Sequence, residues 1–348
     1  GRIMRNYNVA FATLSALSLL LPGVSAAVDW SFSGRAETGF QYYSFEQSPV
    51  VTNTTQPARL NPSQPVTVTT TRSSRKFEDT MPMLGVGGTI FADRFFLDLS
   101  YLKAFDGSDS DDLRDTWNRP TGPFEFGLAS DNTMKSKADF DREESALSLG
   151  YAVTDSFSVY GGWKWAKTDF KERRNGSFQI DAEGSFGVFG RLVGDFQDSV
   201  KYDFENNGPF LGAVYGWNFD GDKIKGNLSA NIAIAFLDGK FENVKQSPTQ
   251  TSNVEASFGG PFRPVLPDPR VDELVGEFVA SGRDFDGDTT GVTFGVNWRG
   301  ETNVEGLTYL LGLSAYQYSF DADNKNGSNG GDVDETVVTF RVGVGYAF

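Results

Sequence analysis

The sequence predicts an all-β fold, a transmembrane antiparallel up-and-down β-barrel. Three observations lead to this prediction: a C-terminal segment with strict two-residue alternation, further alternating segments in pairs joined by short turns, and long polar connections at the opposite ends of those pairs. Each alternating segment has one apolar face and one face of polar, charged or small residues, which is typical of a strand between two different environments. The first and last strands must then pair, because a barrel in lipid leaves no free edge.

The C-terminal segment, Thr336 to Phe348, shows this pattern most clearly. It reads T-V-V-T-F-R-V-G-V-G-Y-A-F, and its apolar face carries Val338, Phe340, Val342, Val344, Tyr346 and Phe348. The segment resembles the final strand of Gram-negative outer-membrane β-barrel proteins of the porin-like class, in which the terminal aromatic residue is part of the signal read by the barrel assembly machinery. This resemblance implies a location in the cell outer membrane, contact with outer-membrane lipid and lipopolysaccharide, and assembly through the C-terminal strand.

Composition narrows the classes of structure and partner. The chain has 348 residues, no cysteine, no histidine and a formal charge of −15. Outside the extreme N-terminus it has no apolar run of about 18 or more residues, so helical membrane spans are excluded. The net negative charge argues against nucleic acid as a partner, because binding phosphates requires lysine and arginine.

The absence of histidine bears on catalysis. The omptin, outer-membrane phospholipase and lipid A deacylase families each place a histidine in their catalytic machinery, and none of those sites can be mapped onto this chain. No phosphate-cradling G-x-x-x-x-G-K-[ST] motif and no thiolate or imidazole metal set occurs either. We therefore expect a protein that is not an enzyme, with a Ser–Lys or carboxylate-pair site as the remaining alternative.

The N-terminal residues 1–26 are predicted to lie outside the fold. Residues 4–26 contain Met4 and Arg5, an apolar stretch from Val9 to Leu21, and small residues before Ala27, which together indicate a secretory signal peptide. Residues 1–3 look like an upstream extension. The predicted outer-membrane barrel domain is 27–348.

The predicted number of strands is ten. The first strand is Trp30 to Tyr43, the last is the C-terminal segment, and between them lie four hairpins at 83–105, 147–165, 211–236 and 292–315. Asn175-Gly176 is a two-residue hairpin signal, and either this hairpin projects above the membrane or 177–192 and 200–207 are two further wall strands, which gives the alternative of twelve. Ten is favoured, since 200–207 is short for a crossing that needs about 9–11 residues.

Long polar connections join the hairpins at the ends opposite to the short turns. They cover roughly 46–80, 106–139, 168–205, 238–289 and 321–335 and are rich in glycine, proline, serine, threonine and aspartate. Short turns on one side and long loops on the other are the periplasmic and extracellular ends of outer-membrane barrels. We expect these connections to be extracellular loops.

Aromatic residues gather near the predicted short turns and the chain ends. The predicted membrane girdle comprises Trp30, Tyr151, Trp217, Trp298, Tyr346 and Phe348. Such rings favour the boundary between lipid and water. Aromatic residues are common in any strand, but their concentration beside the turns favours the girdle interpretation.

The strand faces opposite to the apolar ones carry charges of both signs. The residues predicted to face the lumen are Arg35, Glu37, Asp98, Arg142, Glu144, Lys164, Arg299 and Arg341. A ten-stranded barrel has a narrow interior, between the filled eight-stranded type and the open porins. The charges therefore either fill the barrel as an ion-pair network or line a path that selects solutes.

The leading functional hypothesis is a narrow, porin-like channel for small solutes across the outer membrane. The alternative is a surface-exposed structural or adhesin-type barrel with a closed lumen, whose long acidic loops bind a partner. Barrels of one fold carry functions of both kinds, so the fold does not decide between them. The sequence makes no prediction of the oligomeric state.

One short helix is predicted in the fourth long connection, at about 270–281. Asp268-Pro269 provides a helix start, and the apolar residues that follow share one helical face: Val271, Leu274, Val275, Phe278 and Val279. A helix of about three turns is too short to be stable alone. We expect its apolar face to pack on the barrel mouth as a lid or constriction; the alternatives are neighbouring loops, as a brace, or an external ligand.

Acidic clusters in three connections suggest a cation site. Aspartates at alternate positions can wrap a calcium ion, and Asp284, Asp286 and Asp288 are the candidate ligands. The spacing does not complete a twelve-residue EF-hand loop, so solvated acidic residues are the competing interpretation. No other cofactor is expected.

Overall fold

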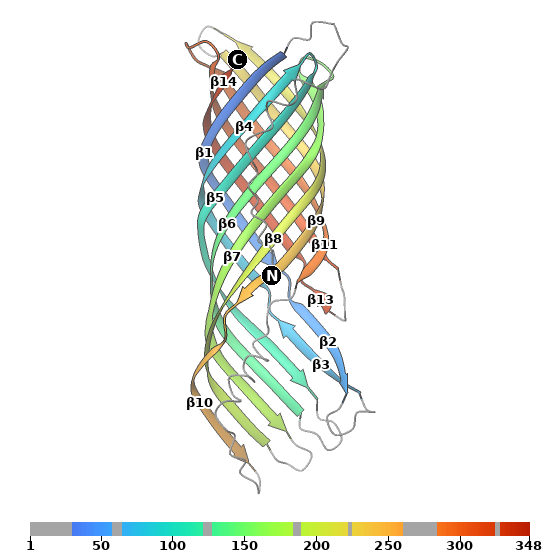
Figure 1. Ribbon diagram of the computed structural model, residues 1–348, viewed down its shortest axis with the longest axis vertical. Helices are drawn as coiled ribbons and strands as arrows, with labels where there is room; N and C mark the ends of the chain where they lie inside the picture. Colours follow the sequence, from blue (N-terminus) through green and yellow to red (C-terminus); the bar gives the residue numbers. More distant parts are fainter. Residues whose placement is uncertain are drawn as a thin grey trace, which may run out of the picture.

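A computed structural model describes residues 30–57, 65–120, 127–183, 189–221, 225–259, 284–323 and 328–348. The described chain is all-β, and ten strands form a closed antiparallel ring (Figure 1). In order around the ring they are β1 (Trp30–Gln47), β4 (Arg75–Ala92), β5 (Phe95–Arg119), β6 (Gly127–Ala152), β7 (Phe157–Glu183), β8 (Phe189–Asp220), β9 (Lys225–Gln246), β11 (Phe285–Glu301), β12 (Leu307–Ala322) and β14 (Val333–Ala347). The predicted ten-stranded barrel is confirmed, and the count of twelve is wrong.

Pairing of the first and last strands closes the ring, as predicted. The β1–β14 ladder runs from Ser33 opposite Ala347 to Gln47 opposite Val333. Glu37 lies opposite Gly343, two positions from Arg341, so both charged side chains project from the same face of the wall. That face is the interior of the barrel.

Four shorter strands lie outside the ring: β2 (Val50–Pro57), β3 (Pro65–Arg72), β10 (Gln250–Gly259) and β13 (Ser328–Gly330). β2 pairs with β3 and β13, β3 pairs with β5, and β10 pairs with β8. In Figure 1 these strands lie towards the end of the barrel opposite to the C-terminus. No helix among the described residues is long and apolar enough to cross a membrane.

Where the structure describes them, the long polar connections are mostly strand, so the prediction of long loops is wrong for these residues. β5 has 25 residues, β6 has 26, β7 has 27 and β8 has 32. A membrane crossing needs about 9–11 residues, so more than half of each of these strands continues the wall beyond the membrane. Beyond the membrane, the outward face of a strand meets water and becomes polar, which is why the apolar pattern ends before the strand does.

The predicted hairpin at Asn175-Gly176 is also wrong. Both residues lie inside β7, where Asn175 is opposite Lys135 on β6 and Gln197 on β8. A Cβ atom on Gly176 would collide with the carbonyl oxygen of Thr133 on β6. The glycine therefore allows close approach of two strands, and it does not make a turn.

An apolar belt encircles the part of the ring nearest the short turns. Its side chains point outward and are exposed, as shown by Phe40 (58%), Leu211 (67%), Ile232 (58%) and Phe294 (57%). On β1 the belt extends from Trp30 to Tyr42. At a rise of about 3.3 Å per residue and a tilt of about 45°, this stretch spans about 28 Å, close to the apolar band of about 25 Å in outer-membrane barrels. The belt is the surface that contacts lipid.

The six residues of the predicted girdle lie at the short-turn end of the belt. Five of them are exposed: Trp30, Tyr151, Trp217, Tyr346 and Phe348. Trp298 is half-buried because its ring packs on Phe219, with the ring centroids 5.6 Å apart. Tyr346 and Phe348 form a similar pair at 4.8 Å. Their placement fits a membrane interface, and that role stays a prediction.

Charge within the belt is expected to block assembly, and strand β9 offers a matched test. Ile232 lies in the middle of the belt and Val244 lies beyond it, and both side chains point outward with similar exposure, 58% and 55%. Ile232→Arg should cost about 2–4 kcal/mol of stability, whereas Val244→Arg should cost little. Folded yield in lipid vesicles and urea unfolding measure both. Equal loss from the two substitutions would contradict the position of the belt.

Two sequence predictions fall outside the described residues. One is the N-terminal segment 1–26, predicted as an extension and a signal peptide. The other is the helix at about 270–281, with Val271, Leu274, Val275 and Phe278 on its apolar face. Both stay predictions.

Candidate functional site

The interior of the barrel brings the predicted lumen residues together in two groups. Near the short turns, Arg35, Glu37, Asp98, Arg299 and Arg341 line a cavity of about 330 Å³. Further from the short turns, Arg142, Glu144 and Lys164 lie in a buried charged layer. All eight residues face the interior, whereas their role in selecting a solute stays a prediction.

Ion pairs organise one side of the cavity. Arg35 donates to both carboxylate oxygens of Asp98, at 2.7 and 3.1 Å, and its Nε lies 3.1 Å from Glu37. Arg341 lies 3.4 Å from Glu37 and donates to Asn297 Oδ1 at 2.7 Å. The side chains of Arg35, Asp98 and Arg341 keep 16–22% exposure, so water reaches this cavity.

Arg299 differs from the other two arginines of the cavity. Among the described residues, its guanidinium has no hydrogen-bond partner and no carboxylate within ion-pair distance. Both acidic residues of the cavity, Glu37 and Asp98, already pair with Arg35 or Arg341. The cavity therefore holds three positive and two negative side chains.

The buried charged layer crosses the lumen. Arg142 on β6 donates to Glu335 on β14, although these strands are not neighbours in the ring. Lys164 on β7 lies 2.8 Å from Glu144 and donates to the hydroxyl of Tyr318 on β12 at 2.6 Å. Each charged side chain is at most 9% exposed. Two positive and two negative charges balance within the layer, as removal of charges from water requires.

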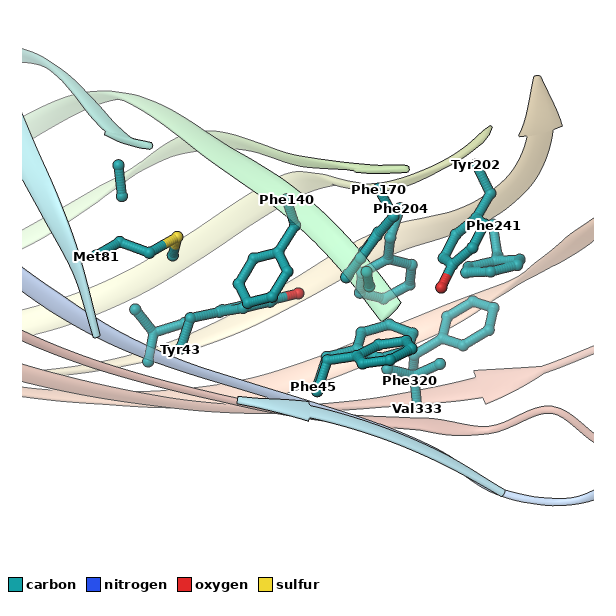
Figure 2. Packing of buried hydrophobic residues seen from close by; sticks show 14 of the residues in the cluster. Tyr43, Phe45, Met81, Phe140, Phe170, Tyr202, Phe204, Phe241, Phe320 and Val333 are labelled. Carbon is teal, nitrogen blue, oxygen red and sulfur yellow. The ribbon is translucent and has the colours of Figure 1, made fainter. Parts of the chain in front are cut away.

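An aromatic cluster fills the lumen next to this layer (Figure 2). Every one of the ten ring strands contributes to it. Its aromatic members are Tyr43, Phe45, Phe77, Phe140, Phe170, Tyr202, Phe204, Phe241, Phe285 and Phe320. Phe45 on β1 contacts Phe170 on β7 across the barrel, with the ring centroids 4.9 Å apart, and Phe204 on β8 at 5.7 Å. We call this cluster the aromatic plug.

A second buried charged layer lies beyond the aromatic plug. Arg174 donates through Nε and Nη2 to both carboxylate oxygens of Asp198, at 2.8 and 2.5 Å, and Arg75 lies 3.9 Å from Glu172. Burial opposes ionisation of Glu172, but Arg75 and Arg174 outweigh it and hold the pKa of this carboxyl below its usual value. Sequence reasoning missed these residues because it assigned them to loops.

The acidic run in β5 bridges β5 and β4 where the backbones of these two strands have separated. Backbone pairing of β4 with β5 ends at Met83 and Ala104, and a bulge at Asp106, with φ of +63°, turns β5 away. Carboxylates then replace backbone carbonyls as acceptors. Asp109 accepts the backbone N–H of Glu78 at 2.8 Å, and Asp111 accepts that of Lys76 at 2.9 Å. These aspartates thus take the place of a strand neighbour as acceptors for the backbone N–H groups of β4.

The other two acidic clusters include residues with the same role. Asp284 accepts the backbone N–H of Asn243 at 2.8 Å, and Asp332 accepts that of Ala322 at 3.0 Å. Asp284, Asp286 and Asp288 are spread along one exposed strand face. Within the described residues, no three acidic side chains gather closely enough to hold a metal ion. Calcium binding by these three stays a prediction.

A trough of about 1030 Å³ lies on the outer wall, on the part of β5–β8 and β10 beyond the belt. Two rows of exposed side chains cross the strands on either side of it. One row is Asp112, Lys135, Asn175, Gln197 and Gln250, and the other is Arg114, Thr133, Ser177, Asp195 and Ser252. Between the rows, the buried side chains of Leu113, Met134 and Phe196 point to the opposite face, so the trough floor there is backbone.

The closed ring, the exposed apolar belt and the aromatic residues at the short-turn end define a membrane-spanning β-barrel of the Gram-negative outer-membrane class. The chain is located in the outer membrane, with the short turns on the periplasmic side and the strand extensions outside the cell.

The sequence matches no protein-family model and no curated protein. Similar solved structures include the outer membrane protease OmpT from Escherichia coli, with 8% identity, coverage of 94% of this chain and 99% of that chain, and a TM-score of 0.46. The translocator domain of the autotransporter NalP from Neisseria meningitidis has 11% identity, coverage of 89% and 88%, and a TM-score of 0.22. The anion-selective porin from Comamonas acidovorans has 13% identity, coverage of 92% and 100%, and a TM-score of 0.19.

Proposed function

We propose that this protein is a surface-exposed outer-membrane barrel with a closed lumen, and that its extracellular wall binds a partner. The observation that carries the proposal is the aromatic plug, to which all ten ring strands contribute. Burial of one aromatic side chain stabilises a protein by about 2 kcal/mol, so exposing all ten rings of the plug would cost on the order of 20 kcal/mol. A state that leaves the lumen open along its length is therefore scarcely populated.

The trough is the proposed binding surface. Its side chains are mainly amides and hydroxyls, as in Asn175, Gln197 and Ser177, and every residue of its two rows is exposed. Amides and hydroxyls both donate and accept hydrogen bonds, as the hydroxyl groups of sugars do. We propose that the partner is of the saccharide class, which includes the sugar chains of lipopolysaccharide beside the barrel.

Paired substitutions test this binding surface. Asn175→Ala with Gln197→Ala should reduce binding to purified lipopolysaccharide sugar chains at least tenfold, measured by surface plasmon resonance on the refolded protein. The control is Asn53→Ala with Gln317→Ala, which removes two exposed amides outside the trough. Equal binding by both double variants, or no binding by the wild type, would overturn the saccharide proposal.

A narrow channel is the second candidate function. It is favoured by the mixed charges inside the part of the barrel that the belt surrounds and by the cavity near the periplasmic end. In a channel, the aromatic plug and the buried charged layer would have to rearrange. Recordings in planar bilayers separate the two candidates, because a channel carries ohmic current and a closed barrel stays silent.

We propose two further partners because the protein is an outer-membrane barrel. Outer-membrane lipid contacts the belt, and the barrel assembly machinery acts on the C-terminal strand. The proposed role is not catalytic, and it requires no cofactor, although calcium could associate with Asp284, Asp286 and Asp288.

A further inference from the structure

Among the described residues, two hydrogen-bond donor groups that line the periplasmic cavity have no partner. Glu37 and Asp98, the carboxylates that line it among the described residues, are each held by Arg35 or Arg341. Arg299 lines the same cavity, and among the described residues it has no partner. Its guanidinium is always positively charged and has five N–H groups, all of which are donors.

Asn297 adds a second donor. Its Oδ1 accepts a hydrogen bond from Arg341 at 2.7 Å, which fixes the orientation of the amide group. The amide nitrogen of Asn297, which can only donate, has no acceptor among the described residues. Arg299 and the amide nitrogen of Asn297 are thus two donor groups in one cavity with no acceptor among the described residues.

The net charge of the cavity indicates that a ligand bound there would be negatively charged. Three arginines and two carboxylates leave one positive charge in excess. A cation that is partly removed from water and unpaired is unfavourable, and a bound anion offsets that cost. A guanidinium forms two parallel hydrogen bonds with an oxyanion, which suits phosphate and sulfate.

We propose that this cavity is a binding site for a small oxyanion of the phosphate or sulfate class, held by Arg299 and the amide nitrogen of Asn297. The cavity of about 330 Å³ lies at the lower end of the range for small-ligand sites. The barrel wall separates it from the surrounding lipid, so the anion enters in free form from the periplasmic side. This proposal does not depend on the partner of the extracellular trough.

Titration of inorganic phosphate tests the site. The refolded protein is held in a sugar-based detergent without phosphate, and binding is measured by isothermal titration calorimetry. Arg299→Gln should weaken phosphate binding at least tenfold. The control is Arg94→Gln, which removes an exposed arginine at a short turn of the same end. Equal binding by the two variants, or no binding by the wild type, would overturn the proposal.

Thermal unfolding provides an independent readout. Phosphate should raise the Tm of the wild type and of Arg94→Gln but leave the Tm of Arg299→Gln unchanged. Without phosphate, Arg299→Gln should be at least as stable as the wild type, because it removes an unpaired charge. A stability loss that phosphate does not affect would show that Arg299 is structural. Binding of a short-chain phosphatidylglycerol without binding of inorganic phosphate would overturn the free anion as the ligand.

Discussion

Substitution of Glu335 by glutamine is expected to destabilise the barrel by about 3–5 kcal/mol, the usual cost of breaking a buried ion pair. Glu335 is 1% exposed and accepts from Arg142, whose side chain is equally buried. With Glu335 neutral, Arg142 and Lys164 share only Glu144. The layer then carries one uncompensated positive charge in the closed interior. Urea unfolding in lipid vesicles measures the change.

Restoring the charge balance provides the control for this prediction. Adding Lys164→Met to Glu335→Gln leaves Arg142 and Glu144, one charge of each sign, 3.6 Å apart. The double variant should therefore be more stable than Glu335→Gln alone, although Tyr318 loses the hydrogen bond from Lys164. The single variants Glu335→Gln and Lys164→Met are measured alongside it. If the stability loss of the double variant equals the sum of the two single losses, charge balance does not hold this layer together.

The part of the fold inside the membrane was predictable from sequence because lipid imposes a strict outward pattern. On β14, Phe340 and Val344 face lipid and are exposed by 51% and 55%, whereas Thr339 faces the interior and is 0% exposed. The same alternation predicted the ring of ten strands and placed both Glu37 and Arg341 on the interior face, where they lie 3.4 Å apart. These features need only a two-residue period and the requirement that the barrel close.

The extracellular half was not predictable by the same reasoning. There both faces of each strand can carry polar residues, because water lies outside and buried ion pairs lie within. The inward positions nevertheless continue the alternation of Lys164 on β7, through Thr168, Phe170, Glu172 and Arg174. Following the inner face past the end of the apolar belt would have found the aromatic plug and the second charged layer. The pairing of Arg142 with Glu335 depends on which strands face each other across the lumen, and alternation does not contain that information.

Replacement of Phe170 by alanine is expected to open the aromatic plug and to produce current where the wild type is silent. Phe170 is 2% exposed, and its ring lies within 6.4 Å of five others, those of Tyr43, Phe45, Phe77, Phe140 and Tyr202. Removing such a side chain typically costs about 3–5 kcal/mol, part of it from the cavity that remains. That cavity lies between two layers of charged residues, which favours its hydration.

Single-channel recording in planar bilayers measures this effect, with Phe45→Ala as a second variant from the opposite side of the lumen. Phe40→Ala is the matched control, because Phe40 lies on the same strand as Phe45 but points outward and is 58% exposed. Wild type and Phe40→Ala should be silent, whereas Phe170→Ala and Phe45→Ala should show discrete current steps. Ohmic current through the wild type would overturn the closed lumen and favour the channel. Folded but silent Phe170→Ala and Phe45→Ala proteins would show that the buried charged layer, rather than the aromatic plug, closes the barrel, because that layer also crosses the lumen from β6 to β14.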